Sequence, residues 1–357
     1  MIRLTEAFRS FTEILVSYLR GEIFKLNFAV TYKCNSHCKM CNAWRRYVDK
    51  PWLVSKELKV EEIALIFQKF QKLAWISITG GEPFLRNDLG DIANLIKENC
   101  NPKMLNLTTN GLDTCLIEKN VYKVLDADVP LTFINVSLDG PPEVHDNMRG
   151  INGAFSKAVK TIEMLHALSK EFNNLSVGFE YTATPFNAGS LTLLFDELAR
   201  KDLRWLLENV TVTIYHTGNL YDNLDSNQQV SGNTFKDKAL EDLSAGLRSV
   251  RSKSPLALVS KTYLKLAQKY MLEEHVPLSC VALYNSLFLN PYGDVYPCII
   301  LDKKIGNLRD FNYDIHALLR SAAAVKLRNE IKGCRLCWTP CEAYPSILVH
   351  PTSLIRP

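Results

Sequence analysis

The feature that most constrains the fold is a regular alternation of short apolar strands with amphipathic helices. Strand-like runs rich in β-branched and aromatic residues occupy 26–31, 75–79, 104–108, 131–138, 175–181 and 210–215. Between them, apolar residues recur at helical spacing over 58–73, 88–98, 155–169 and 191–200. Strands separated by helices predict parallel pairing with right-handed crossovers. Because six such units are found and no convincing seventh or eighth, we expect an α/β fold, a partial (βα)6 TIM-like barrel.

The remainder of the chain predicts smaller units around this barrel. Apolar residues at helical spacing over 2–20 predict an amphipathic helix that packs on the protein's own body. Docking of this helix on a membrane surface is not favoured, because its polar face is mixed in sign. A polar stretch at 219–233 predicts a linker, followed by a helical segment over about 235–274 and a small cysteine-rich domain. The expected regions are an N-terminal helix (1–24), the barrel (25–220), a linker and helical segment (221–279), the cysteine-rich domain (280–345) and a C-terminal tail (346–357).

Composition and charge exclude several classes of protein. Of the 357 residues 47% are hydrophobic, which is enough for a sizeable core, and the net charge of +4 is too mild to indicate a nucleic-acid partner. Neither a secretory signal nor an uncharged run of the roughly 20 residues needed to span a bilayer is present. A cytoplasmic location is therefore expected. In that reducing compartment, clustered cysteines among the ten of this chain favour metal binding over disulfides.

Three cysteines directly follow the first expected strand, at Cys34, Cys38 and Cys41. In βα barrels, active sites form at the carboxyl ends of the strands. Thiolates favour zinc, Cu(I) or iron–sulfur clusters, and three ligands for a four-iron cluster leave one iron open for chemistry. The alternative is a structural zinc loop with His37 as fourth ligand. On that alternative, the chain would be a zinc-binding protein without redox chemistry.

The Cys-x3-Cys-x2-Cys spacing after a first strand resembles the signature of the radical S-adenosylmethionine (SAM) superfamily. The resemblance implies a [4Fe-4S] cluster on these three cysteines, whose open iron chelates SAM. It also implies that an electron from the cluster cleaves SAM, and that the resulting 5′-deoxyadenosyl radical abstracts hydrogen from a substrate. An electron donor such as ferredoxin or flavodoxin is then the expected partner.

Further motifs follow the next strands in the order that the same family shows. The Gly80-Gly81-Glu82-Pro83 turn follows the second strand, Thr109-Asn110-Gly111 ends the third, and Ser137-Leu138-Asp139-Gly140 ends the fourth, before Arg149. Taken singly, the third-strand motif also fits an ordinary loop, and Arg149 fits a surface ion pair. The resemblance implies SAM contacts with Ser137 at the ribose and Arg149 at the methionyl carboxylate, which a guanidinium matches in two hydrogen bonds. The expected SAM-binding residues are Gly80, Gly81, Glu82, Pro83, Asn110, Ser137, Arg149 and Met40, the last at a position where the family commonly has an aromatic residue.

A second group of cysteines lies in the C-terminal region. Its spacing, Cys280-x12-Gly293-x4-Cys298 and then Cys334-x2-Cys337-x3-Cys341, resembles the auxiliary-cluster domain of one branch of the superfamily. That domain has a long form (SPASM) and a short form (Twitch), and the five cysteines present fit the short form. The resemblance implies one auxiliary [4Fe-4S] cluster on Cys280, Cys298, Cys334 and Cys337, for substrate binding or electron acceptance.

Several points around this second group stay open. Cys341 would replace one of the four ligands, belong to a partial second cluster, or be a plain thiol, and structural zinc is the alternative metal. The stretch around Gly293 predicts a hairpin turn. Cys100 and Cys115 are interpreted as ordinary buried residues.

The substrate is the least constrained part of the prediction. Candidates for proton transfer at the barrel mouth are Glu180, Tyr215 and His216, together with Tyr181 and Asp294. About 24 residues precede the first strand, too few for a leader-peptide-binding domain. A small molecule or lipid head group is therefore favoured as substrate, and a peptide- or protein-modifying maturase is the alternative.

Overall fold

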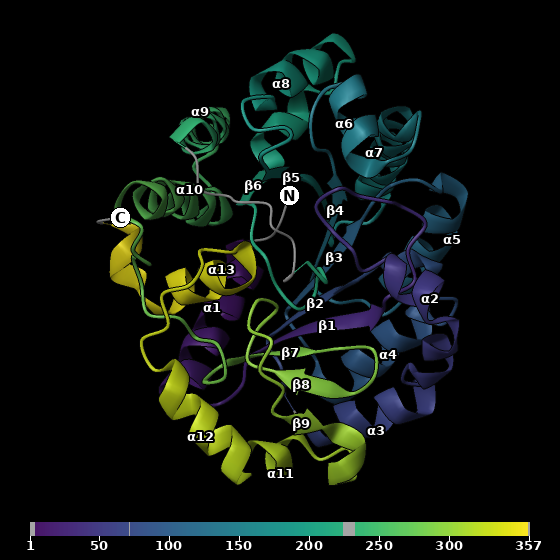
Figure 1. The fold of residues 1–357 in the computed structure, drawn as a ribbon, viewed down its shortest axis with the longest axis vertical. Coiled ribbons are helices and arrows are strands. Elements are labelled where there is room, and N and C mark those ends of the chain that lie inside the picture. Colours follow the sequence, from purple (N-terminus) through teal and green to yellow (C-terminus); the bar gives the residue numbers. More distant parts are fainter. Residues whose placement is uncertain (1–3, 71, 224–232, 356–357) are drawn as a thin grey trace.

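The centre of the molecule is a sheet of six parallel strands. The structure, a computed structural model, describes residues 4–70, 72–223 and 233–355. Figure 1 shows the strands side by side in the order β6-β5-β4-β3-β2-β1. Their bounds are β1 Lys25–Thr31, β2 Trp75–Gly80, β3 Met104–Thr109, β4 Leu131–Ser137, β5 Leu175–Ala183 and β6 Val210–Ile214. All five pairings among them are parallel, which confirms the expected partial barrel.

Helices cover the outer face of this sheet. Each presents an apolar stripe to the strands, as Ile63, Ile66 and Phe67 do in α3, because residues three and four apart share one helical face. These outer helices are α3 Val60–Phe70, α4 Leu89–Cys100, α5 Thr114–Leu125, α7 Ala154–Glu171, α8 Leu191–Arg200 and α9 Asn233–Ser249. Short helices fill the connections: α2 Arg45–Asp49, α6 Pro142–Arg149, and the 3-10 turns Pro51–Lys56, Pro83–Leu85 and Arg204–Asn209.

The sheet continues beyond the barrel into the cysteine-rich region. Strand β7 (Ser286–Leu289) pairs in parallel with β1, and β8 (Asp294–Tyr296) and β9 (Gly306–Asn307) follow as antiparallel partners. Gly293 turns the β7–β8 hairpin with φ +87°, as expected from the sequence. The backbone hydrogen bonds between β1 and β7 therefore join the two regions that the sequence predicted to be separated near residue 280.

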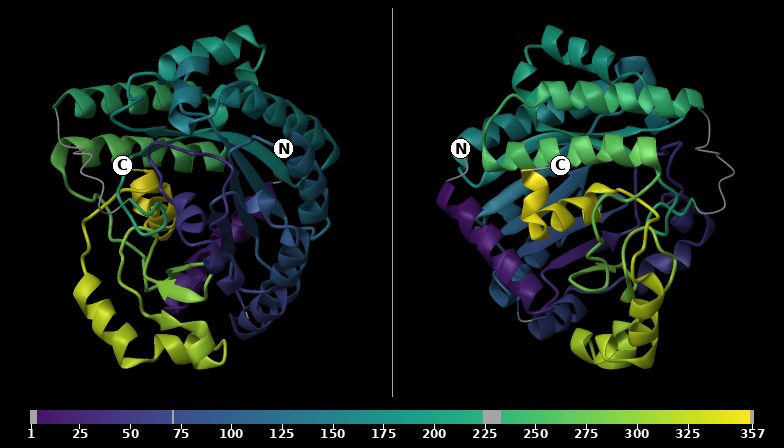
Figure 2. Two further views of the ribbon diagram at one scale, coloured as in Figure 1. Left: turned by 45° about the vertical axis from the view of Figure 1, so that its right-hand side comes forward. Right: turned by 90° about the vertical axis from the view of Figure 1, so that its left-hand side faces the viewer.

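The side of the barrel that six strands leave open is covered by helices. The segment expected as one helical stretch over 235–274 forms two helices, α9 and α10 (Pro255–Glu273), because Pro255 and the Ser254 cap begin a new helix. Helix α13 (Pro340–Val349) packs on α10 (Figures 1 and 2). Helices α11 (Ile315–Leu319) and α12 (Ala322–Ile331) and the 3-10 turns Leu308–Phe311 and Pro351–Leu354 complete the C-terminal region. Of the expected linker, 224–232 lie outside the described residues.

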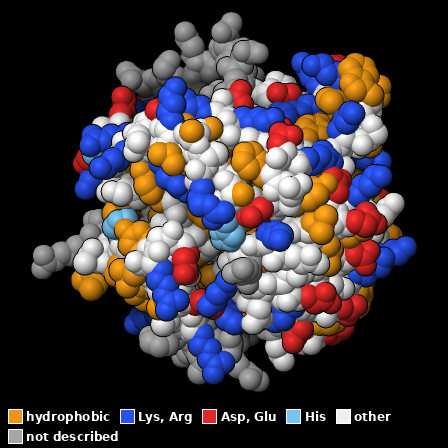
Figure 3. Space-filling view, turned by 90° about the horizontal axis from the view of Figure 1, so that it is seen from below, with side chains coloured by type: hydrophobic (Ala, Val, Ile, Leu, Met, Phe, Trp, Pro, Cys, Tyr) orange, Lys and Arg blue, Asp and Glu red, His pale blue; other side chains and the backbone are white. Residues whose placement is uncertain are grey.

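Helix α1 (Leu4–Leu19) packs on the protein's own body, as expected. Ile14 is fully buried in a small cluster with Phe24 and Val349, and Glu13 forms an ion pair with Lys72 at 2.7 Å. Within the described ranges, no helix is both long and apolar enough to cross a membrane. On the face seen from below in Figure 3, Lys and Arg side chains are interspersed with Asp and Glu.

Candidate functional site

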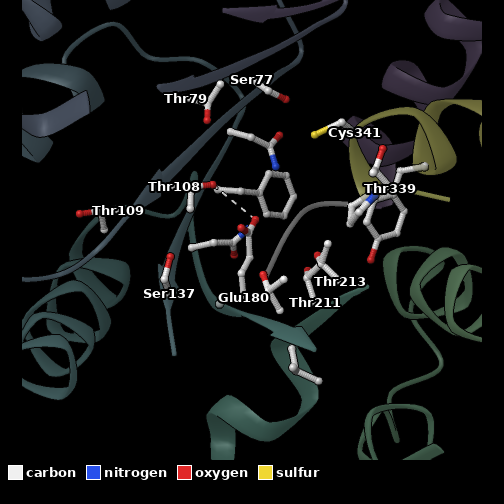
Figure 4. Close-up of a pocket in the computed structure, with 18 of the residues that line it drawn as sticks. Ser77, Thr79, Thr108, Thr109, Ser137, Glu180, Thr211, Thr213, Thr339 and Cys341 are labelled. Carbon is white, nitrogen blue, oxygen red and sulfur yellow. Dashed lines mark hydrogen bonds between the residues drawn. The ribbon is translucent and has the colours of Figure 1, made fainter. Parts of the chain in front are cut away.

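A cavity of about 870 Å³ runs through the barrel from the carboxyl ends of the strands to their amino ends. The Cys34–Cys41 loop lines it at the carboxyl end, and the start of α10 lines it at the other. Helix α13 closes its open side: Thr339, which precedes the helix, and Cys341 face the cavity (Figure 4), and Tyr344 also lines it. The loops that carry the sequence motifs thus share one space with the inward-facing side chains of the strands.

The three cysteines of the first cluster meet at the mouth of this cavity. Cys34, Cys38 and Cys41 all line it, and burial raises the pKa of Cys34 and Cys41 to about 12. Buried thiols of this kind ionise only when a positive charge such as a metal compensates them. Arg149 supplies one such charge, since its Nη1 lies 3.5 Å from the Cys38 sulfur.

His37 does not join these cysteines at the cavity. Its side chain is exposed and packs edge-on against Trp44, with ring centroids 4.7 Å apart. In the part of the chain that the structure describes, no group of three or more His, Cys, Asp or Glu side chains is arranged to hold a metal ion. A four-iron cluster has a looser requirement, because each thiolate binds a different iron.

The turn after β2 is pressed against the end of β1, which explains its glycines. A Cβ on Gly80 would lie 2.1 Å from the Thr31 carbonyl oxygen, and a Cβ on Gly81 would lie 2.3 Å from that of Lys33. Gly80 also has φ +136°, which favours glycine. Both glycines line the cavity, so their backbone is open to a ligand there.

Glu82 does not line the cavity; its side chain connects the turn after β2 to the end of β3 through hydrogen bonds. Its carboxylate accepts hydrogen bonds from the backbone N–H groups of Asn110 (2.7 Å) and Phe84 (3.2 Å) and from the Thr109 hydroxyl (3.0 Å). Burial raises its pKa to about 7 despite these donors. Glu82 and Pro83 therefore hold the turn to the end of β3 and stay behind the cavity wall.

The other expected SAM contacts do face the cavity. Asn110, Ser137, Arg149 and Met40 all line it. Asn110 donates to Asn35 Oδ1 at 2.7 Å, and Arg149 Nη2 lies 2.6 Å from the buried carboxylate of Asp139. This ion pair is internal, not the surface pair that the sequence left open, and it fixes the guanidinium beside the cysteines.

The candidates for proton transfer divide into two groups. Glu180, Tyr215 and His216 line the cavity. Burial raises the pKa of Glu180 and lowers that of His216 to about 4. Tyr181 and Asp294 do not line the cavity: Tyr181 donates to Asp242 at 3.0 Å, and Asp294 pairs with Lys304. Their strand positions place these two side chains on other faces.

The second group of cysteines surrounds a separate small pocket. Cys280, Cys298, Cys334 and Cys337 line it, together with Glu342. Burial raises the pKa of Cys337 to about 12, and those of Cys280 and Cys298 rise well above their ordinary value. A pocket lined by four thiols, of which Cys298 is buried and the other three are partly buried, suits an iron–sulfur cluster, because each thiolate of such a cluster binds a different iron.

Cys341 faces the large cavity and not the four-cysteine pocket. Its helical neighbour Glu342 turns the other way, accepting hydrogen bonds from Asn27 and Ser286 at 3.2 and 3.1 Å. Of the remaining cysteines, Cys100 is buried as expected. The same expectation for Cys115 is wrong, because this residue lies exposed at the start of α5.

Lys25 is a cavity residue that sequence reasoning missed. It is 1% exposed, donates to the Cys341 carbonyl and lies 4.2 Å from the centroid of the Trp75 ring. Burial lowers its pKa. The sequence could have indicated this position, because Lys25 directly precedes the apolar run of the first strand. The expected strand began at residue 26 and therefore left Lys25 out.

Comparisons with known protein families match both the barrel and the cysteine-rich C-terminal region. The model of the radical SAM superfamily matches residues 28–185, and that of an iron–sulfur cluster-binding domain (SPASM) matches residues 280–341. The AdoMet-dependent heme synthase of Oleidesulfovibrio alaskensis is 25% identical over 305 residues, covering 80% of this chain and 71% of that protein. The Fe-coproporphyrin III synthase of Methanosarcina barkeri is 30% identical over 176 residues, covering 49% of this chain and only 40% of that protein.

Solved structures show the same fold at low identity. Native anSMEcpe with bound AdoMet aligns with a TM-score of 0.57 and 16% identity, covering 93% of this chain and 98% of that one. Streptococcus suis SuiB bound to S-adenosylmethionine aligns with a TM-score of 0.56 and 15% identity, covering 88% of this chain and 71% of that one. These likenesses establish the arrangement of the barrel and its C-terminal extension.

Proposed function

Because this chain belongs to the radical SAM superfamily and carries a C-terminal SPASM-type iron–sulfur domain, we propose that its barrel cavity is the site of hydrogen abstraction from a small molecule. The [4Fe-4S] cluster and SAM supply the reductive cleavage and the radical chemistry when bound. The observation that carries the proposal is that Cys34, Cys38 and Cys41 open into the same cavity as the inward-facing side chains of the strands.

The residues at the mouth fit a cluster and SAM. Cys34, Cys38 and Cys41 would hold the cluster, and Arg149 beside Cys38 offsets the negative charge of the thiolates. The exposed backbone at Gly80 and Gly81 would receive the methionyl amino group, and Ser137 the ribose. Asn110 lies 3.9 Å from the Cys34 sulfur through its Nδ2 and orders the neighbouring loop through Asn35.

The four-cysteine pocket fits one auxiliary cluster. Its ligands would be Cys280, Cys298, Cys334 and Cys337, since these four line the pocket and Cys341 does not. Helix α13 separates this pocket from the barrel cavity. A cluster held there would supply an electron acceptor close to the substrate space, because Cys341 of α13 faces the barrel cavity while its neighbour Glu342 lines the pocket.

Interior placement of the cavity favours a small molecule as substrate. Strands line it on one side, and α13 and the start of α10 line it on the other. A lipid head group would enter by the same route, whereas a peptide needs an extended open path. An external low-potential reductant such as ferredoxin or flavodoxin would supply the electron for SAM cleavage.

The test is formation of 5′-deoxyadenosine from SAM by the anaerobically reconstituted protein with dithionite. We expect about eight irons per chain and measurable 5′-deoxyadenosine in the wild type. The Cys38→Ala variant should form none, and Cys334→Ala should keep SAM cleavage while losing about four irons. Cys100→Ala serves as a matched control, because this cysteine is buried behind the sheet and lines neither site. A colourless protein with stoichiometric zinc, or SAM cleavage by Cys38→Ala, would contradict the proposal.

A further inference from the structure

Hydroxyl-bearing side chains line part of the inner surface of the barrel, among apolar ones. The interior of a complete (βα)8 barrel is filled by layers of branched apolar side chains. Here Ser77 and Thr79 of β2, Thr108 of β3, and Thr211 and Thr213 of β6 line the cavity instead (Figure 4). Apolar residues alternate with them and face the helices, since strand side chains point to opposite faces in turn. The hydroxyls therefore belong to the ligand space and not to the core.

One acidic side chain lies among these hydroxyls. Glu180 Oε1 accepts hydrogen bonds from Thr108 at 3.4 Å and from Asn135 at 3.3 Å. Both bonds end on the same oxygen, which leaves Oε2 for a ligand, and Figure 4 shows the side chain turned into the cavity. Among the described residues, Glu180 has no ion-pair partner within 4.0 Å.

The cations that line the cavity are already engaged or lie at its far end. Arg149 is paired with Asp139 at 2.6 Å beside the cysteine loop. Lys25 donates to the Cys341 carbonyl under the Trp75 ring. Lys253 is exposed, next to the start of α10. Arg149 is thus neutralised, Lys253 is remote, and burial lowers the pKa of Lys25, whereas a cation would find the carboxylate of Glu180.

Aromatic rings complete the surroundings of Glu180. Phe133 and Tyr344 line the same cavity, as does Tyr221. Burial raises the pKa of the Tyr221 and Tyr344 phenols, and the nearby Glu180 charge raises it further. Aromatic faces attract cations, most strongly where water is excluded. A carboxylate, a ring of hydroxyls and aromatic faces together suit an ammonium group on a hydroxylated molecule.

We propose that the substrate is a small polyhydroxylated molecule bearing a protonated amine, which Glu180 binds through an ion pair. This inference rests on the proposed function, because it assigns the substrate class of the same cavity. The amine docks on Glu180 Oε2, and the threonine and serine hydroxyls exchange hydrogen bonds with the hydroxyl groups of the ligand. Glu180 is a binding residue in this arrangement, and the mouth remains available for SAM.

The test is a comparison of matched probes on the reconstituted, SAM-bound protein, by anaerobic calorimetry without reductant. One set is Tris, pentaerythritol and 2,2-bis(hydroxymethyl)propionate, which share one skeleton and carry an amine, a neutral group and a carboxylate. The second set is glucosamine, glucose and glucuronate. In at least one set, we expect the amine to bind at least about tenfold more tightly than its neutral and acidic counterparts, which corresponds to about 1.4 kcal/mol.

Two variants decide whether Glu180 causes this preference. Glu180→Gln keeps the shape and removes the charge, so the amine and the neutral probe should then bind equally. Glu208→Gln is the matched control, because Glu208 lines the far end of the cavity and bonds to the Ser252 backbone N–H at 3.1 Å. This control should keep the amine preference.

Equal binding within both sets, tighter binding of a carboxylate probe, or an unchanged preference in Glu180→Gln would each overturn the inference. Formation of 5′-deoxyadenosine by the wild type is measured in parallel. If SAM is cleaved but amines are not preferred, the substrate class is wrong and the proposed function stands. If SAM is not cleaved, the proposed function itself fails.

Discussion

At the scale of single residues, buried polar groups and glycines fix the geometry of the site. Glu82 joins the turn after β2 to the end of β3, and Asp242 joins α9 to the start of α8. Gly80 lets the turn cross the end of β1. Motif spacing identified Gly80 and Glu82. The sequence did not indicate the buried role of Asp242, because an acidic residue on a helix ordinarily faces water.

Replacing Gly80 by alanine should be severely destabilising. The new Cβ would meet the Thr31 carbonyl oxygen at 2.1 Å, and φ +136° is strained for any residue with a side chain. We expect a loss of at least ~3 kcal/mol in the free energy of unfolding, or no soluble protein. Gly153→Ala is the control, because it has positive φ but open space and should cost only about 1 kcal/mol. Similar unfolding midpoints in urea for the two variants would contradict this prediction.

Replacing Asp242 by asparagine should destabilise the protein in a pH-dependent manner. The carboxylate accepts from the backbone N–H groups of Gly189 and Leu191 and from the Tyr181 hydroxyl, and an amide loses one of its two acceptor oxygens. The expected cost is ~1–3 kcal/mol.

The pH dependence follows from the pKa of Asp242, which burial raises to about 6. The folded state then binds a proton more tightly than the unfolded state, so the stability gained from it is present at low pH and is lost as pH rises from about 4 to about 6. The difference in unfolding free energy between wild type and Asp242→Asn should therefore be larger at pH 5 than at pH 8. Equal differences at the two pH values would rule out this assignment.

At the scale of elements, α13 lies between the barrel cavity and the four-cysteine pocket, and two adjacent residues of this helix line the two sites. Cys341 faces the barrel cavity and Glu342 faces the four-cysteine pocket, because successive residues of a helix point in different directions. Spacing alone left the role of Cys341 open. The structure places Cys341 at the cavity, and this position depends on the packing of α13 against α10, which no local pattern encodes.

The Cys341→Ala variant should therefore keep the auxiliary cluster. We expect its iron content to equal that of the wild type, whereas Cys334→Ala should lose about four irons per chain. The measurement is iron and sulfide analysis after anaerobic reconstitution, with Cys115→Ala as an exposed control. An equal loss of iron in the Cys341 and Cys334 variants would instead make Cys341 a ligand.

At the scale of the whole molecule, the barrel and the cysteine-rich region form one sheet. Strand β7 covers the edge of β1, all seven residues of which are buried. Helices α10 and α13 fill the side where a complete barrel would have further strands. The auxiliary region is thus part of the cavity wall as well as a separate site.

A chain truncated after residue 279 should fail to form a stable barrel. Removal of β7 leaves the buried edge of β1 with unpaired backbone groups, and removal of α13 exposes the cavity. We expect aggregation by size-exclusion chromatography. The full chain with Cys334→Ala and Cys337→Ala should stay soluble, because it keeps the strand and the helix. A soluble, folded 1–279 fragment would show that the sheet does not depend on β7.

The sequence by itself determined the six strands, most outer helices and the two cysteine groups, because strand and helix periodicities and motif spacing are local properties. The alternation of apolar and polar residues along β6 also predicts that the hydroxyls of Thr211 and Thr213 lie on the same face of the strand. Only the tertiary structure decided that β7 extends the barrel sheet, that Lys25 is buried in the cavity, and that Cys341 faces the cavity and not the four-cysteine pocket. The first two outcomes depend on contacts between segments more than 200 residues apart, such as that of Lys25 with Cys341, and the third depends on the packing of α13 against α10. Packing between distant segments leaves no periodic trace in the sequence.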